Sequence, residues 1–205
     1  VGIKGGRIVT GYYKKGSNEI IPMVEDYLQP ELGDQILSVV RDWMEELEIQ
    51  PYDRTNKAGI IKHIGIRTNQ SNEAMVIIVT SFTKLTELHS LVHKLVKKAP
   101  GVISVFQNIN SEDGPFTYGH QYRHLVGKEK LVDYIGDLRF EISPNSFFQV
   151  NPRQVEVLYN TALEYLELTD NDLVCDIYSG IGTITLSAAK KAKRVYGIES
   201  MKAAV

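Results

Sequence analysis

The stretch Leu173-Val-Cys-Asp-Ile-Tyr-Ser-Gly-Ile-Gly-Thr183 decides how this sequence is interpreted. Its first five residues are typical of a buried β-strand, and the glycines that follow are typical of a tight turn into a helix. We expect that helix over residues 184–192 and a second strand over 194–198, directly before Glu199. The pattern predicts a βαβ unit, whose glycine turn lets a ligand approach the backbone beside free N–H groups of the helix N-terminus.

Two classes of cofactor are bound by turns of this kind. A dinucleotide fingerprint has the form G-x-G-x-x-G, and Thr185 stands where its third glycine would be. S-adenosylmethionine enzymes commonly combine an acidic residue, a G-x-G turn and a second acidic residue at the end of the next strand. That arrangement is followed here by Asp176, Gly180, Gly182 and Glu199. Because the Glu199 carboxylate can accept two hydrogen bonds from ribose hydroxyls, the spacing favours S-adenosylmethionine, although a plain strand–helix turn would also contain such glycines.

The chain before this unit alternates between strand and helix patterns. We expect a helix over 32–47 and then a hairpin of 60–67 with 75–79 across a turn at 69–72. A helix over 85–96, ended by Pro100-Gly101, and a strand over 102–109 should follow. After a loop over 111–130 we expect a hairpin over 131–142 that turns at Gly136-Asp137, and a helix that starts at Asn151-Pro152. The sequence therefore predicts an α/β protein with a compact α/β domain over about 55–112.

The composition is that of an ordinary globular protein, with 43% hydrophobic and 23% charged residues, which excludes collagen-like and low-complexity chains. With 23 basic and 25 acidic side chains the net charge is −2, so any RNA contact must use local patches. The longest apolar run is about five residues, against roughly 20 for a membrane span, so we expect no membrane partner. The single cysteine, Cys175, cannot form an internal disulfide, which fits a cytoplasmic protein.

Ile142-Ser-Pro-Asn-Ser-Phe-Phe-Gln-Val-Asn151, followed by Asp176-Ile-Tyr-Ser-Gly-Ile-Gly182, resembles the RumA/TrmA family of RNA uracil-C5 methyltransferases. The first string is long and unusual, so it is far more specific than G-x-G. Upstream, Gly11-Tyr-Tyr-Lys-Lys-Gly-Ser17 and the segment from Tyr52 to Arg67 are similar to that family's central domain. The resemblance implies a small central α/β domain over 1–125 that positions RNA, followed over 126–205 by the first βαβ part of an incomplete Rossmann-like S-adenosylmethionine methyltransferase domain.

The resemblance also implies roles for single residues. The cofactor would be held by Asp176, Tyr178, Gly180, Gly182, Thr183, Glu199 and Gln149, the last being the glutamine of F-F-Q-V-N. Phe147 and Phe148 would shape a pocket for an extruded base, since aromatic faces commonly hold flipped nucleotides, with core packing as the other interpretation. From charge alone, Arg123 and Lys128 are candidates for contact with the RNA backbone, although such residues are usually only solvated.

The implied activity is transfer of a methyl group from S-adenosylmethionine to C5 of a uridine in 23S rRNA, with RNA as partner and no obligatory protein partner. That chemistry needs a cysteine thiolate that adds to C6 and a carboxylate base. Both are expected beyond Val205, so the chain holds no catalytic residue, and the fragment alone is expected to be inactive. Cys175, expected inside a buried strand, is rejected as the nucleophile.

Metal centres find little support in the sequence. Some relatives carry an iron–sulfur cluster held by four cysteines, which this chain does not support; Tyr27 stands about where the fourth ligand would fall. The pairs His89/His93 and His120/His124 have helical spacing but no third ligand nearby, so we expect no metal site.

Two other functions remain open on the sequence. One is an S-adenosylmethionine enzyme of different chemistry, such as an amino-group methyltransferase. The other is a non-catalytic RNA-binding module, which would bind RNA independently of the cofactor.

Overall fold

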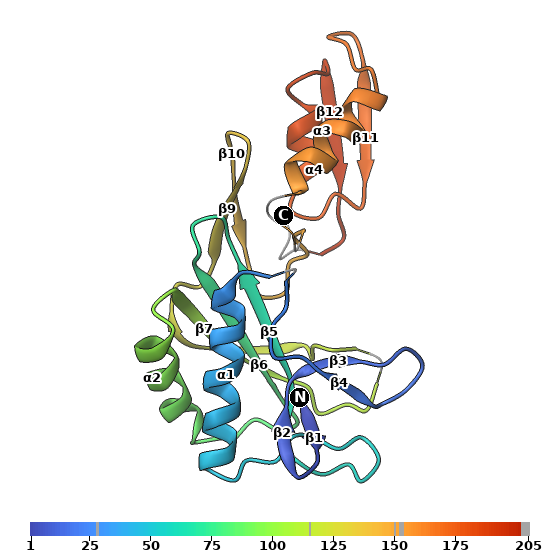
Figure 1. Cartoon of the computed structure of the whole chain (residues 1–205). Helices are drawn as coiled ribbons and strands as arrows, with labels where there is room; N and C mark the ends of the chain where they lie inside the picture. Colours follow the sequence, from blue (N-terminus) through green and yellow to red (C-terminus); the bar gives the residue numbers. More distant parts are fainter. Residues whose placement is uncertain (28, 115, 150, 152–153, 202–205) are drawn as a thin grey trace. The chain divides into compact units, whose positions relative to one another are not determined.

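The computed structural model describes residues 1–27, 29–114, 116–149, 151 and 154–201, which form two compact units (Figure 1). The first unit contains Val1–Thr68 and Asn72–Glu129, and the second contains Asn69–Ser71 and the chain from Lys130 onward. The boundary between the two units falls after Glu129, whereas the sequence led us to expect it after residue 125. Residue 125 lies within a strand that pairs inside the first unit.

The first unit is built on a four-stranded sheet with the order β5-β6-β7-β8. Its strands are β5 (Ile61–Thr68), β6 (Ala74–Thr80), β7 (Val102–Ile109) and β8 (Gln121–Gly127). The β5–β6 hairpin is antiparallel as expected, β6 and β7 are parallel, and β7 and β8 are antiparallel. The expectation of an irregular segment over 111–130 was wrong for β8, which is an edge strand with mostly exposed side chains.

Two helices pack on the sheet of the first unit (Figure 1). They are α1 (Glu31–Glu46) and α2 (Leu88–Lys98), and α2 begins three residues later than expected. Their apolar faces form one core with the side of β6 that carries Ala74, Val76 and Ile78. The connection from β6 to β7 through α2 is the crossover that parallel strands require. The N-terminal segment forms two short hairpins, from β1 (Gly2–Lys4), β2 (Arg7–Val9), β3 (Gly11–Tyr13) and β4 (Ile20–Pro22).

The second unit begins with the predicted hairpin of β9 (Leu131–Ile135) and β10 (Leu138–Ile142), which turns at Gly136-Asp137. The next helix is α3 (Val155–Tyr165); its expected start at Asn151-Pro152 lies partly outside the described residues. Three of its side chains are buried, Val155, Tyr159 and Leu163, whereas Leu158 and Leu166 are exposed.

The βαβ unit is confirmed as β11 (Leu173–Ile177), α4 (Thr183–Ala188) and β12 (Arg194–Ile198), with the two strands parallel. The helix is shorter than the 184–192 expected. The expectation that residues 173–177 are buried was wrong, because Leu173 is 68% exposed and Cys175 is also exposed. In the described sheet β11 pairs only with β12, and α4 packs on the face of the sheet that carries Asp176. Because side chains alternate along a strand, Leu173, Cys175 and Ile177 point to the opposite face, where they are exposed to solvent.

None of the described helices combines the length and the apolar content needed to cross a lipid bilayer; the longest, α1, has 16 residues.

Candidate functional site

The glycine turn between β11 and α4 folds back onto the end of β12. The backbone N–H groups of Tyr178 and Ser179 both donate to the Ile198 carbonyl, at 2.9 and 3.0 Å. Gly180 and Gly182 have φ angles of +56° and +81°, which only glycine adopts without strain. A Cβ placed on Gly180 would meet nothing within 4 Å, so this face of the turn is open.

Gly197, the next-to-last residue of β12, packs against this turn and was not predicted from the sequence. A Cβ at Gly197 would lie 3.1 Å from Ser179 Oγ and 3.3 Å from Thr185 Cγ2. The missing side chain therefore allows the turn and α4 to approach the strand closely. A glycine inside a predicted strand is a signal for such an approach and could have identified it.

Glu199 places an ionised carboxylate directly beside the turn. Its Oε2 accepts a hydrogen bond from the Gly180 N–H at 2.9 Å, and Oε1 accepts from the N–H groups of Met201 at 2.8 Å and Ser200 at 2.7 Å. The hydrogen bonds from Met201 and Gly180 lower the pKa of Glu199, which stays charged at neutral pH. Each carboxylate oxygen has a second lone pair, so the group can also accept hydrogen bonds from a ligand.

The other two polar residues predicted here support the turn from the helix side. Asp176 Oδ2 accepts a hydrogen bond from the Thr185 hydroxyl in the first turn of α4. Thr183 Oγ1 lies 3.0 Å from the Tyr159 hydroxyl of α3. The structure therefore brings the predicted Asp176, Tyr178, Gly180, Gly182, Thr183 and Glu199 together around one turn.

Tyr178 is held in a strained backbone conformation, with φ of +67°, while its side chain is 88% exposed. Left-handed conformations of non-glycine residues cost of order 1 kcal/mol or more and concentrate at functional sites. We expect Tyr178→Gly to raise the free energy of unfolding by up to about 1 kcal/mol, because the relief of strain exceeds the added entropy of the unfolded chain. Urea denaturation measures this change.

The matched variant for this prediction is Tyr178→Ala, which removes the ring but keeps the strained backbone. If the Tyr178 ring flanks bound S-adenosylmethionine, both variants should lose affinity for this cofactor to the same extent. Only Tyr178→Gly should gain stability. Equal stability of the two variants would contradict the strain, and wild-type affinity in both would remove Tyr178 from the site.

The irregular segment 143–149 begins with a turn over residues 143–146. The Ser143 and Ser146 hydroxyls lie 2.6 Å apart, and the Ser146 N–H donates to the Ser143 carbonyl. Phe148 is buried with its ring centroid 6.0 Å from that of Phe140, whereas Phe147 is 73% exposed. Gln149 is half-buried. Of the two phenylalanines, Phe147 alone presents a free ring.

The basic residues expected to contact RNA lie in the first unit. Arg123 is exposed on β8. Lys128 is paired with Glu73 at 3.3 Å. The described residues contain no group of three or more His, Cys, Asp and Glu side chains placed to hold a metal ion.

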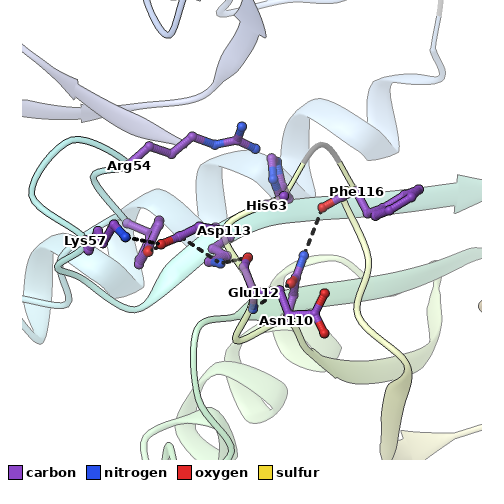
Figure 2. Close-up of a pocket in the computed structure, with 10 residues that line it drawn as sticks. Arg54, Lys57, His63, Asn110, Glu112, Asp113 and Phe116 are labelled. Atoms are coloured by element: carbon purple, nitrogen blue, oxygen red, sulfur yellow. Dashed lines mark hydrogen bonds and ion pairs between the residues drawn. The ribbon is translucent and has the colours of Figure 1, made fainter.

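A pocket of about 300 Å³ in the first unit was not predicted from the sequence (Figure 2). It is lined by Tyr52, Arg54, Lys57, Lys62, His63, Asn110, Glu112, Asp113, Gly114 and Phe116. These residues come from two segments about 50 positions apart, and no short motif connects them. Burial, aided by the charges of Arg54 and Lys62, lowers the pKa of His63 to about 4, so its imidazole is neutral at pH 7.

Comparison with known proteins shows close similarity to RNA methyltransferases. No protein-family model matches the chain. It is 45% identical over 206 residues to an uncharacterized RNA methyltransferase of Caldanaerobacter subterraneus, covering 100% of this chain and 46% of that protein. It is 39% identical to an uncharacterized RNA methyltransferase of Clostridium tetani, covering 100% of this chain and 45% of that one. The chain thus spans less than half the length of these relatives.

Among solved structures, the chain is similar to the Pyrococcus abyssi tRNA (uracil-54, C5)-methyltransferase in complex with S-adenosyl-L-homocysteine. The match has a TM-score of 0.75 and 23% identity, and it covers 94% of this chain and 46% of that one. The described chain is therefore a mixed α/β protein that has the fold of the corresponding part of that methyltransferase.

Proposed function

We propose that this protein is an S-adenosylmethionine-dependent RNA methyltransferase that acts on C5 of a uridine in 23S rRNA. The observation that carries the proposal is the ionised Glu199 carboxylate, bound to the Gly180 N–H beside an open G-x-G turn. The names of the relatives support RNA methylation as the activity. The resemblance of Ile142–Asn151 and Asp176–Gly182 to the RNA uracil-C5 methyltransferases supports the finer assignment.

The described residues of the turn fit the cofactor, which would supply an activated methyl group. Glu199 would accept hydrogen bonds from the two ribose hydroxyls, in addition to those it accepts from the backbone. The methionine part would pass over Gly180, where the absence of a Cβ leaves open space. Asp176 and Thr183 would fix the helix side of the turn, and Tyr178 and Gln149 would flank the ligand.

The RNA-facing part of the proposal uses exposed residues. Phe147 would stack on the extruded uracil, because its ring is exposed. The buried Phe148 would anchor this segment by packing against Phe140. Arg123 would contact the RNA backbone directly. Lys128 would first have to exchange its ion pair with Glu73 for a phosphate.

The nucleophile and the base of the reaction are assigned to parts of the protein other than this chain. Cys175 is exposed, contrary to expectation, yet it is still a poor candidate. Successive strand residues point to opposite faces, and Asp176 points toward α4, so Cys175 lies on the other face of the sheet.

A tritium-release assay with the complete protein tests the proposal. Methylation at C5 replaces the hydrogen on that carbon, so 23S rRNA transcribed with [5-³H]uridine should release tritium to water only when S-adenosylmethionine is added. The same RNA with methyl-labelled cofactor reports all methyl transfer. We expect the two signals to appear in equal amounts, and no transfer to a tRNA transcript.

Three results would contradict this assignment in different ways. Methyl transfer without tritium release would indicate another chemistry, such as amino-group methylation. Tritium release from tRNA alone would contradict the 23S rRNA target. RNA binding with no transfer at all would favour a non-catalytic RNA-binding module.

A further inference from the structure

The loop between β7 and β8 is fixed to the sheet by buried polar side chains. Asn108, fully buried, accepts a hydrogen bond from the Gly119 N–H at 2.8 Å and donates to the Gly119 carbonyl at 2.9 Å. Asn110, also buried, donates to the Phe116 carbonyl at 2.9 Å. Because these amides would be costly to bury without partners, they hold the backbone of Phe116 and Gly119 against the sheet.

A buried lysine holds the other side of the same loop. The Lys62 side chain is 7% exposed, and its Nζ donates to the Glu112 carbonyl at 2.8 Å. The same Nζ lies 4.3 Å from the centre of the Tyr52 ring and 4.0 Å from Asp113 Oδ1. Lys62 thus ties the loop to the start of β5.

The same segment presents an aromatic ring to solvent. The Phe116 side chain is 73% exposed although its backbone carbonyl is held by Asn110, and Figure 2 shows the ring pointing away from the loop. A large apolar ring gains nothing in stability from this position. An aromatic ring that is already positioned loses little entropy when a flat ligand stacks on it.

The pocket beside Phe116 carries an excess of positive charge. Its charged groups are Arg54, Lys57, Lys62, Glu112 and Asp113, which sum to +1. Asp113 is shared by Lys57 at 3.3 Å and Lys62 at 4.0 Å.

Arg54 forms no ion pair with Asp113. None of the described carboxylates lies within ion-pair distance of Arg54, whose guanidinium carbon is 5.6 Å from the centre of the Tyr13 ring. Figure 2 shows its side chain extending toward His63. Burial lowers the pKa of both His63 and Lys62, and the charge of Arg54 lowers both further, whereas Asp113 raises that of Lys62.

We propose that the pocket and Phe116 together hold one nucleotide of single-stranded RNA, with its phosphate on Arg54 and its base stacked on Phe116. A phosphate would supply the missing anion, and an aromatic ring stacks on any unpaired base. A duplex keeps its bases inside the helix, so it could offer only the phosphate. This inference rests on the proposed function, because it gives the RNA substrate a second anchoring point on the first unit.

The test measures the affinity of the complete protein for a fluorescein-labelled 12-nucleotide oligouridylate by anisotropy, without cofactor. Phe116→Ala should raise the Kd about 10-fold, in line with the loss of one stacked base. Phe116→Tyr should restore most of the affinity and Phe116→Leu should not, which separates stacking from apolar contact. The control Lys97→Gln removes an exposed charge from α2 and should change the Kd less than two-fold.

The contribution of Arg54 is measured from the salt dependence of oligouridylate binding. Arg54→Gln should reduce the slope of log K against log salt concentration by about 0.7, the value for one phosphate contact on a single strand. A 12-base-pair RNA duplex should bind the wild type more weakly than the single strand and should be unaffected by Phe116→Ala.

Several results would overturn this inference. The first is that Phe116→Ala and Arg54→Gln bind the oligouridylate with the same affinity as Lys97→Gln. The second is that the wild-type protein does not bind the oligouridylate, and the third is that it binds the RNA duplex more tightly than the single strand. Displacement of the probe by polyglutamate, with Phe116→Ala unaffected, would assign the pocket to an acidic protein instead.

Failure of the proposed function would look different from failure of this inference. A protein that transfers no methyl group but keeps the Phe116 and Arg54 effects would contradict only the function. A protein that releases tritium normally while these two variants bind RNA like Lys97→Gln would contradict only the subsite.

Discussion

Changing Glu199 to alanine is expected to weaken S-adenosylmethionine binding by about 10- to 100-fold, because charge-assisted hydrogen bonds to the ribose would be lost. The carboxylate is ionised, and its hydrogen bonds with Gly180 and Met201 fix its position before any ligand binds. Isothermal titration of the complete protein with the cofactor measures this change. The control Glu164→Ala removes an exposed carboxylate from α3 of the same unit and should leave the affinity unchanged.

The alanine variant also removes support from the turn, so a second variant is needed. Glu199→Gln keeps one oxygen that can accept from the Gly180 N–H, but its amide group cannot accept a second ribose hydroxyl. Its affinity should fall between those of the wild type and the alanine variant. Wild-type affinity in both Glu199 variants would contradict the ribose-binding role.

Changing Trp43 to alanine should lower the free energy of unfolding of the first unit by about 3–5 kcal/mol, the usual cost of removing a large aromatic side chain from a core. Trp43 is fully buried on α1, and its indole N–H donates to the Ser90 hydroxyl of α2 at 3.0 Å. It therefore joins the two helices that cover the sheet. Since it is the only tryptophan of the chain, urea denaturation should be followed by circular dichroism instead of fluorescence.

Two comparisons sharpen the Trp43 prediction. Trp43→Phe keeps most of the apolar volume and loses the hydrogen bond, so its cost should be clearly smaller. Tyr165→Ala removes an aromatic side chain that is exposed on α3 and should change stability by less than about 0.5 kcal/mol. A loss of less than about 1 kcal/mol for Trp43→Ala would contradict the assigned core.

Elements with strong periodicity were predictable from the sequence. The apolar spacing of α1 and the apolar run of β6 match elements that bury one face or both faces, so their positions were predicted within a residue or two. The edge strand β8 was missed because Gln121-Tyr-Arg-His-Leu-Val-Gly127 pairs on one side only and contains few apolar residues. The burial of β11 was overestimated because burial depends on which strands and helices lie against it, and an apolar run does not specify them.

The candidate cofactor site was largely predictable, because parallel strands place their carboxyl ends at one edge of the sheet. Asp176 and Glu199 follow from that rule and from the glycine spacing. The strained φ of Tyr178 was not predictable, since no residue type signals it. The charged pocket was not predictable either, because the β-sheet brings Arg54 and Phe116 together across about 60 residues of sequence.

The most direct test of the central claim is a crystal structure of the complete protein with S-adenosylhomocysteine. Our account predicts both ribose hydroxyl oxygens about 2.5–2.8 Å from the Glu199 carboxylate, with the amino-acid part lying over Gly180 and Gly182. A ligand whose ribose is bound elsewhere, with Glu199 contacting only the backbone of its own turn, would contradict it.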